Sequence, residues 1–297
     1  MIDKLEMYLA LAKTRHFGKA AEEIGVTQPT LSAAIKQLEE QLGVMLVYRG
    51  SRFKGLTPEG QRVQEWARQI VSDARAMKEE MRFARQGLSG NLRLAVIPTA
   101  LTPASQLTAH FAEMHPNIRL TILSRSSSQI LEMMDNLEID AGISYLDDEP
   151  LGRVVHEPLY AEKYVLVSAS PMAQATVRWQ DLGDMPLCLL TPDMLNRRII
   201  NQHLKEADVL VQPRIEANTI TVLISHVLSG NWATILPVKA AEIHLAGSKL
   251  HAVPITKPDA SHRVGLIAPY QEPHTPVIAA LLSEAKGLAR KWTAQGA

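Results

Sequence analysis

Residues 17–42 decide the fold of the N-terminal part, and they read FGKAAEEIGVTQPTLSAAIKQLEEQL. Apolar side chains recur at helical spacing in the first half of this stretch, at Phe17, Ala20, Ala21 and Ile24. Gly25 follows, and glycine suits a turn that needs a positive φ. Thr27 is then placed to cap a second helix, with Pro29 in its first turn, where proline is tolerated. The stretch therefore predicts two helices joined by a tight turn.

The second of these helices has one apolar and one polar face. Its inward stripe is predicted to consist of Leu31, Ile35, Leu38 and Leu42. The remaining residues face outward: Gln28, Thr30, Ser32, Ala33, Lys36 and Gln37. Short polar side chains at the start of a helix can reach base edges in the major groove, and a lysine can contact a phosphate. This layout is typical of a DNA-reading helix, although a three-helix bundle with a solvated polar face has the same spacing.

A long signature here resembles that of the LysR family of bacterial transcription regulators. The matching residues are Phe17, Ala20, Ala21, Ile24, Val26, Thr27, Gln28, Pro29, Leu31, Ser32, Ile35, Leu38, Glu39, Leu42, Gly43, Val44 and Leu46. The resemblance implies a winged helix-turn-helix whose recognition helix faces the major groove with Thr27, Gln28, Pro29, Thr30, Ser32 and Lys36.

Two positions depart from the family pattern. Family members often carry an arginine just after the Leu-Ser pair, where this chain has Ala33 and Ala34. Val47-Tyr48-Arg49 stands where the family often has Phe and Arg. The first departure removes one potential guanine contact, so the base preference stays open.

Charge favours DNA binding only through its local distribution. The chain has 31 Lys and Arg against 31 Asp and Glu, so no net charge draws it to nucleic acid or membrane. Cations cluster at Arg49, Arg52 and Lys54, in a turn-rich segment that resembles a wing lying along the DNA backbone. A single such domain would bind DNA weakly, so we expect paired domains on a two-fold site.

Composition limits the class of protein. Hydrophobic residues make up 46% and charged residues 21% of the chain, as in an ordinary globular protein. The single cysteine, Cys188, excludes a disulfide within the chain and lies in an apolar run typical of a core. The first 23 residues lack the apolar run of a signal peptide, and no stretch approaches roughly 20 apolar residues. We therefore expect a cytoplasmic protein with no membrane contact.

A long helix is predicted over residues 59–89, beginning near Pro58 and ending around Gly87. Apolar residues alternate at spacings of four and three along it: Val63, Ala67, Ile70, Ala74, Met77, Met81, Ala84 and Leu88. This narrow stripe predicts a helix–helix seam, although packing on its own domain would give the same periodicity. The resemblance implies that this linker helix makes a homodimer or homotetramer.

From residue 90 onward, short apolar runs alternate with helical segments, which predicts parallel sheets with crossover connections. The resemblance divides the chain into a DNA-binding domain (1–58), the linker helix (59–89) and an effector-binding α/β domain (90–297). It also implies that the α/β domain is two-lobed, like a periplasmic binding protein. Lobe one would contain about 91–161 and 269–297, and lobe two about 162–268.

Small ligands bind in the crevice between such lobes. Hydroxyls mark two strand-to-helix junctions of lobe one: Thr99, Thr102, Ser126 and Ser127. Helix N-termini with hydroxyls favour an anion, and in the family the positions matching Thr99 and Ser127 contact the effector. From lobe two we expect Asn218, Thr219 and Arg197, whose guanidinium could clamp a carboxylate. Each hydroxyl could instead be a plain N-cap.

Two other classes of function fit less well. The first is an enzyme. The sequence contains no metal-binding or catalytic motif, so we expect no cofactor, no metal and no catalytic residue. A transport-type binding module would suit residues 91–297 but leaves the helix-turn-helix unexplained. The sequence therefore predicts a promoter-binding transcription regulator modulated by a small anionic effector, with RNA polymerase as a further partner.

Overall fold

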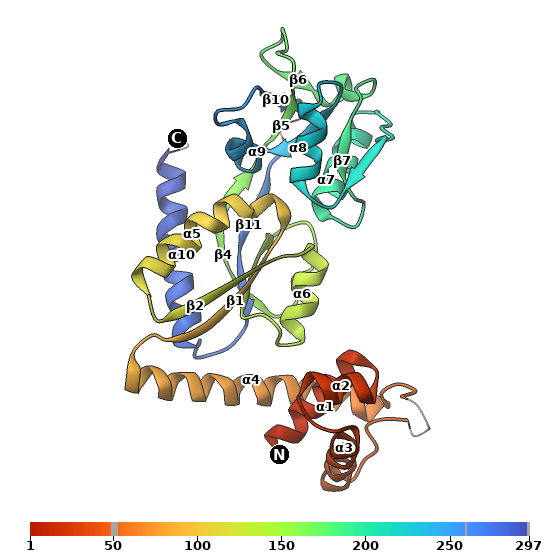
Figure 1. Cartoon of the computed structure of the whole chain (residues 1–297), viewed down its shortest axis with the longest axis vertical. Coiled ribbons are helices and arrows are strands. Elements are labelled where there is room, and N and C mark those ends of the chain that lie inside the picture. Colours follow the sequence, from red (N-terminus) through yellow and green to blue (C-terminus); the bar gives the residue numbers. More distant parts are fainter. Residues whose placement is uncertain (49–52, 259, 296–297) are drawn as a thin grey trace. The chain divides into compact units, whose positions relative to one another are not determined.

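The computed structural model describes residues 1–48, 53–258 and 260–295. Its contacts divide the chain into two units, which we describe separately (Figure 1). The first unit contains Met1–Gly87 with two short segments, Asp135–Glu138 and Gln271–Pro276. The second contains Leu88–Met134, Ile139–Tyr270 and Val277–Ala297. No helix within the described ranges has the length and apolar character needed to cross a bilayer.

Three short helices and one long helix make up most of the first unit. The short helices are α1 (Ile2–Thr14), α2 (Phe17–Glu23) and α3 (Gln28–Leu42). Between α2 and α3 the chain turns at Gly25, whose φ of 70° explains the glycine there. The apolar faces of these helices share one core, which includes Leu5, Tyr8, Leu11, Ala20, Leu31, Ile35 and Leu38. A bridge between Val47 and Leu56 closes the base of the segment that follows α3.

The long helix α4 (Pro58–Gln86) begins and ends where the sequence pattern predicts. The Thr57 hydroxyl caps it by accepting a hydrogen bond from the Gly60 N–H at 2.9 Å. Gly87, with a φ of 69°, ends it. Gly60 lies so close to the Leu46 carbonyl that a Cβ at this position would clash with it.

Lobe one of the second unit is built on a five-stranded sheet in the order β2-β1-β3-β11-β4. Its strands are β1 (Gly90–Val96), β2 (Ile118–Ser124), β3 (Ala141–Tyr145), β4 (Val154–Glu162) and β11 (His262–Pro269). Its helical segments are η1 (Pro98–Ala100), α5 (Leu101–Met114), α6 (Ser127–Asp135) and α10 (Pro276–Gln295).

Lobe two contains a four-stranded sheet, β6-β10-β5-β9, and a two-stranded sheet, β7-β8. These strands are β5 (Tyr164–Ser168), β6 (Val177–Arg178), β7 (Cys188–Leu190), β8 (Ile215–Ala217), β9 (Ala233–Pro237) and β10 (His251–Thr256). Its helical segments are η2 (Trp179–Leu182), α7 (Leu195–Glu206), α8 (Ile220–Leu228) and α9 (Val238–Leu245).

Two expectations about this unit are wrong. The sheets are mixed, because β11 runs antiparallel to β3 and β4, and β5 runs antiparallel to β9 and β10. In addition, β11 belongs to the sheet of lobe one, so lobe two ends before residue 262 and not at 268. The apolar run RVGLIAP predicts a strand but does not specify its partners, because register depends on residues far away in the sequence.

Candidate functional site

The first candidate site is the exposed face of α3. Thr27 caps the helix, since its hydroxyl accepts a hydrogen bond from the Thr30 N–H at 3.3 Å and lies 2.8 Å from the Thr30 hydroxyl. Gln28, Pro29 and Ser32 are exposed around this cap. The start of the helix thus presents several exposed polar side chains in one place, an arrangement that suits contact with a phosphate or base edge.

Lys36 extends this face by two turns and is 63% exposed. Its ammonium lies 3.7 Å from Glu40, also exposed, and such surface pairs contribute little free energy. Lys36 is therefore able to exchange this partner for a phosphate. Leu42, predicted to face inward, is instead 40% exposed at the last residue of α3.

The opposite side of α3 is fixed to the core of the first unit. Leu31, Ile35 and Leu38 are buried, and the buried Glu39 carboxylate accepts hydrogen bonds from the N–H groups of Leu46 at 2.8 Å and Val47 at 3.3 Å. The polar face is thus held in a defined orientation. Arg49 and Arg52, the predicted wing cations, lie outside the described residues.

The predicted seam on α4 is only partly correct. Ala67 and Ala74 are buried and Val63 packs on the same core, so these residues belong to the unit's own interior. Leu88 packs against the core of the second unit. The exposed apolar residues lie on the neighbouring face of the helix, at Trp66, Ile70, Met77 and Met81. Periodicity identified the apolar positions but not the boundary between two adjoining faces.

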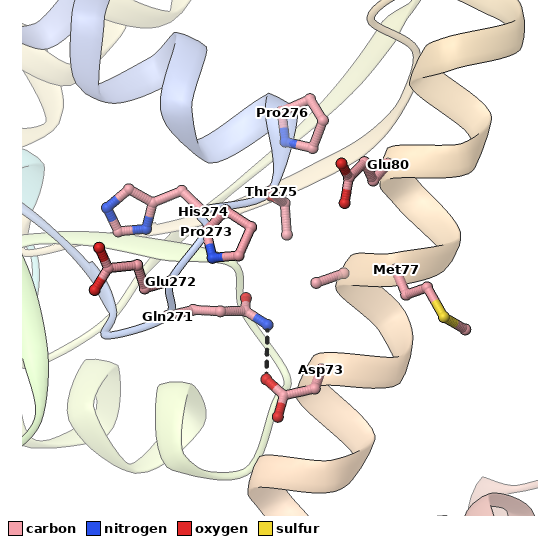
Figure 2. Close-up of a pocket in the computed structure, with 10 residues that line it drawn as sticks. Asp73, Met77, Glu80, Gln271, Glu272, Pro273, His274, Thr275 and Pro276 are labelled. Atoms are coloured by element: carbon pink, nitrogen blue, oxygen red, sulfur yellow. Dashed lines mark hydrogen bonds between the residues drawn. The ribbon is translucent and has the colours of Figure 1, made fainter.

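One part of that face borders a pocket of about 190 Å³ within the first unit (Figure 2). Met77 and Glu80 line it on α4, opposite residues 271–276. The Gln271 amide donates a hydrogen bond to the Asp73 carboxylate at 3.2 Å across it. Met77 nevertheless remains 58% exposed, so it belongs to the same accessible apolar face as Trp66, Ile70 and Met81.

The second candidate site lies where lobe one meets lobe two. A cavity there is lined by residues of both lobes: Ile97, Pro98, Thr99, Ser126, Ser127, Tyr145, Leu190, Met194, Leu195 and Asn196. Its volume is about 10 Å³, which is room for about one water molecule. A larger ligand can bind here only if the lobes separate.

The Tyr145 hydroxyl connects the lobes at this cavity. It accepts a hydrogen bond from the Asn196 amide on α7 at 3.0 Å and donates one to the Glu162 carboxyl at 2.7 Å. The Thr99 hydroxyl lies 3.4 Å away. Burial raises the pKa of Glu162 to about 8, against the hydrogen bond from Tyr145, which lowers it. Glu162 is therefore mostly protonated at neutral pH.

Several polar atoms around the cavity have no hydrogen-bond partner among the described residues. They are Ser127 Oγ, Asn196 Oδ1 and Glu162 Oε1. Ser126 instead caps α6, because its hydroxyl accepts from the Gln129 N–H at 3.3 Å. Leaving a buried polar atom without a partner costs about 1–3 kcal/mol. A bound molecule that supplied these hydrogen bonds would recover that free energy.

The predicted effector residues are only partly brought together. Thr99, Ser126 and Ser127 line the cavity, whereas Thr102, Arg197, Asn218 and Thr219 do not. Arg197 is buried, and its guanidinium donates to Leu190 O at 2.6 Å, Glu216 at 2.7 Å and Asn201 at 2.8 Å. It is therefore a structural ion pair in lobe two and not an effector clamp. Thr219 caps α8.

Sequence reasoning missed Tyr145, Glu162 and Asn196 as parts of this site. Tyr145 ends a fully buried strand, where a tyrosine hydroxyl must find a partner, and that was the available signal. Glu162 and Asn196 follow ordinary strand and helix patterns, so their burial depends on contacts made far along the sequence. The described residues contain no group of three or more His, Cys, Asp or Glu that could hold a metal.

Two family models match consecutive parts of the chain. Residues 2–61 match the family described as "Bacterial regulatory helix-turn-helix protein, lysR family", and residues 85–290 match "LysR substrate binding domain". The DNA-binding transcriptional dual regulator OxyR of Escherichia coli K12 is 29% identical over 273 residues, which span 90% of this chain and 88% of OxyR. A probable hydrogen peroxide-inducible genes activator of Mycobacterium avium is 28% identical over 268 residues, spanning 89% and 86% of the two chains.

Solved structures show the same fold. A full-length OxyR variant from Pseudomonas aeruginosa superposes with a TM-score of 0.73 at 24% identity, covering 96% of this chain and 97% of that chain. Full-length CbnR in complex with its target DNA has a TM-score of 0.60 at 20% identity, covering 97% and 99%. The relatives are transcription regulators and not enzymes. The chain therefore belongs to the LysR family of DNA-binding transcription regulators, which carry a substrate-binding domain and bind promoter DNA as oligomers.

Proposed function

We propose that this regulator reads a partly palindromic promoter site through the exposed face of α3. We further propose that a small effector, held where the lobes meet, changes the spacing of the two heads of a dimer. Two features of the chain support the proposal together. One is the exposed polar face of α3, and the other is the buried polar cluster where the lobes meet, in which several atoms lack a hydrogen-bond partner. An effector can act only to the extent that it binds one lobe arrangement better than another.

The reading of bases is assigned to Gln28, and that of phosphate to Lys36. Replacement of Gln28 by alanine should relax the preference at one base position, because a bidentate base contact contributes about 1–3 kcal/mol of discrimination. Lys36→Ala should weaken binding to all duplexes alike. It should also reduce the slope of the logarithm of the binding constant against the logarithm of salt concentration by about one. Selection from a randomised duplex pool, followed by binding titrations in varied salt, separates the two effects.

The matched controls are Gln202→Ala and Lys286→Ala, which remove exposed side chains from helices of the second unit. Neither change should alter the selected sequence or the salt slope. If both pairs of variants behave alike, α3 is not the reading helix.

The exposed apolar face of α4 is assigned to pairing of two chains. Trp66, Ile70 and Met81 lie on one side of the helix at spacings compatible with a helix–helix seam. Ile70→Asp with Met81→Asp should convert the oligomer to monomers in light scattering and weaken operator binding. Leu210→Asp with Ile243→Asp, at exposed apolar positions of lobe two, should change neither. An unchanged mass of the α4 variant would refute this assignment.

The effector is assigned to the site around Thr99 and Ser127. We infer a small molecule with an anionic or strongly accepting group, because Ser127 opens α6, a helix N-terminus favours negative charge, and Thr99 adds a hydroxyl. With Arg197 engaged elsewhere, no lining residue of the cavity carries a positive charge. The anion would therefore be held by hydroxyl and N–H donors.

A thermal-shift screen of small carboxylates and phosphates against the full chain tests this assignment, since a saturating ligand raises the melting temperature by mass action. Thr99→Val with Ser127→Ala should abolish the shift caused by any hit. Ser283→Ala, an exposed serine on α10, should leave it intact. A shift that survives in the Thr99/Ser127 variant would place the effector elsewhere.

Peroxide sensing by a thiol is not favoured for this chain, although some relatives are named as hydrogen peroxide-inducible activators. Cys188 is the only cysteine of the chain, so no intrachain disulfide can form. It is fully buried, and burial raises the pKa of its thiol to about 11, which suppresses the reactive thiolate. We expect Cys188→Ser to leave the response to effector and the binding of DNA unchanged. A loss of response in that variant would instead support sensing through the Cys188 thiol.

The remaining assignments follow from the family. We infer that the protein works in the cytoplasm and contacts RNA polymerase at the promoter. Residues 1–58, 59–89 and 90–297 would be its DNA-binding, dimerising and effector-binding parts.

A further inference from the structure

A chain of hydrogen bonds through two histidines crosses from lobe two to lobe one. Nε2 of His203, on α7, lies 2.9 Å from Nε2 of His262, the first residue of β11. Nδ1 of His262 in turn lies 2.9 Å from Oδ1 of Asp148, which follows β3. The order Asp148–His262–His203 therefore joins the end of a lobe-one strand to a lobe-two helix.

This chain is the far end of a longer contact between α7 and lobe one. At the start of α7, Asn196 donates to the Tyr145 hydroxyl. Two residues further, Arg198 lies 3.5 Å from Glu149. His203 makes the third contact, and Trp179 of lobe two holds its ring by stacking at 5.0 Å between centroids. Three polar contacts thus join the lobes along α7. The third is made by two histidine rings, which can both take up a proton.

The number of protons on the two rings decides whether the third contact exists. An imidazole nitrogen either donates through its hydrogen or accepts through its lone pair. A bond between two Nε2 atoms therefore needs one hydrogen between them. Nδ1 of His262 uses a second hydrogen toward Asp148. In this geometry the two rings together can carry two or three hydrogens on their nitrogens. A fourth hydrogen would charge both rings. It would also leave the two Nε2–H groups pointing at each other, with the nitrogens 2.9 Å apart.

The surroundings also set the order of protonation. The groups around the pair are Asp148, Glu149, Glu162, Tyr164, Glu206 and Arg263. Glu206 Oε2 is 3.4 Å from Nδ1 of His203, but its side chain is half-exposed and its attraction is screened. Burial, followed by repulsion from His262, lowers the pKa of His203, so its protonation comes at a more acidic pH.

We propose that the His203–His262 pair is a proton-operated latch, which holds α7 against lobe one while the pair carries at most one charge and releases it when both rings are charged. Acidification below neutral pH then opens the lobes without an effector. The latch concerns lobe closure alone, so it can fail without affecting the proposed reading of DNA by α3.

Hydrogen–deuterium exchange of the full chain between pH 7.5 and pH 5.5, corrected for the intrinsic pH dependence of exchange, tests the latch. In the wild type, peptides covering α7 should lose about tenfold or more protection on acidification, since a tenfold change corresponds to one pH unit of coupled titration. His203→Gln should keep the same protection at both pH values, because its amide can donate to His262 and does not titrate. His226→Gln, which replaces a half-buried histidine on α8 away from this contact, should behave as the wild type.

Two outcomes overturn the proposal: no loss of α7 protection in the wild type, or the same loss in His203→Gln. If that variant does not fold, imidazole ¹⁵N shifts of the wild type decide. The latch requires the pair to gain its second positive charge at a lower pH than the pH at which His226 becomes charged. Full protonation of both rings with α7 still protected would refute it.

Discussion

Buried polar groups beside α3 and buried polar groups where the two lobes meet differ in how fully they are hydrogen-bonded. In the first unit, Glu39 accepts two backbone N–H groups, Tyr8 donates to Gly60 O at 2.7 Å, and Thr57 donates to Met45 O at 2.6 Å. In the second unit, Ser127 and Asn196 each bury an atom that has no partner among the described residues.

The difference reflects what each unit must do. A head that reads DNA benefits from a face fixed in advance, because a preorganised surface loses less conformational entropy on binding. A sensing domain needs an open and a closed lobe arrangement of similar free energy. Unsatisfied polar atoms raise the free energy of the closed arrangement, and this reduces the difference between the two. The following substitutions test the contrast in order of expected effect.

The largest effect is expected from crowding the fixed head. Gly60→Ala would drive a methyl group into the Leu46 carbonyl and toward the Tyr8 hydroxyl, which should cost about 3 kcal/mol or more. Calorimetry of the full chain should show a destabilised first unit, with loss of DNA binding. Gly287→Ala on α10 meets no atom within 4 Å and should stabilise by about 0.5–1 kcal/mol. Similar melting of the Gly60 variant and the wild type would contradict the packing described.

A smaller effect is expected at the contact between the lobes. Tyr145→Phe removes the hydroxyl between Asn196 and Glu162, and should destabilise the second unit by about 1–3 kcal/mol. Urea unfolding measures the loss. Tyr48→Phe, which alters an exposed tyrosine, serves as the control. If Tyr145→Phe leaves stability unchanged, the hydroxyl is not part of a stabilising network.

The cap of the reading helix should contribute about 1 kcal/mol. Thr27→Ala leaves the Thr30 N–H without its acceptor, so the first turn of α3 should fray and the operator affinity should fall several-fold. Thermal unfolding of the first unit and a binding titration provide the two measurements. Ser32→Ala, on the same exposed face, should leave unfolding unaltered; an equal change in both variants would argue against capping.

The last expected effect concerns how stability changes with pH and not its value at one pH. The folded-state pKa of Glu162 is raised from 4.5 to about 8, so folded protein holds this proton more tightly than unfolded protein does. Its stabilising contribution is complete below pH 4.5 and is lost as the pH rises toward 8. Glu162→Gln should remove this part of the slope in urea unfolding between about pH 5 and 8. Glu132→Gln, exposed on α6, should retain the wild-type slope, and a matching slope in the Glu162 variant would refute the assignment.

The sequence predicted the local features well. Thr27 and Pro29 define the start of α3, and Pro58 and Gly87 mark the ends of α4, because the ends of a helix depend on a few neighbouring residues. The outward residues of α3 followed from a single helical period.

Features that depend on distant partners were not predictable in this way. Arg197 and a free effector clamp look alike until Glu216, nineteen residues away, is placed beside it. Ala67 and Ile70 have equal standing in a heptad, but α1 covers the former and not the latter. Likewise, the cavity combines residues from Ile97 to Asn196, and no local pattern specifies that meeting.

The ratio of affinities for a selected duplex and a scrambled duplex of equal length, measured for the wild-type chain at one fixed salt concentration, tests the central claim most directly. If α3 reads base edges, the selected duplex should bind about 10³-fold more tightly or better. A ratio near one, with binding that only follows salt, would show that the protein contacts the backbone alone and would contradict the account.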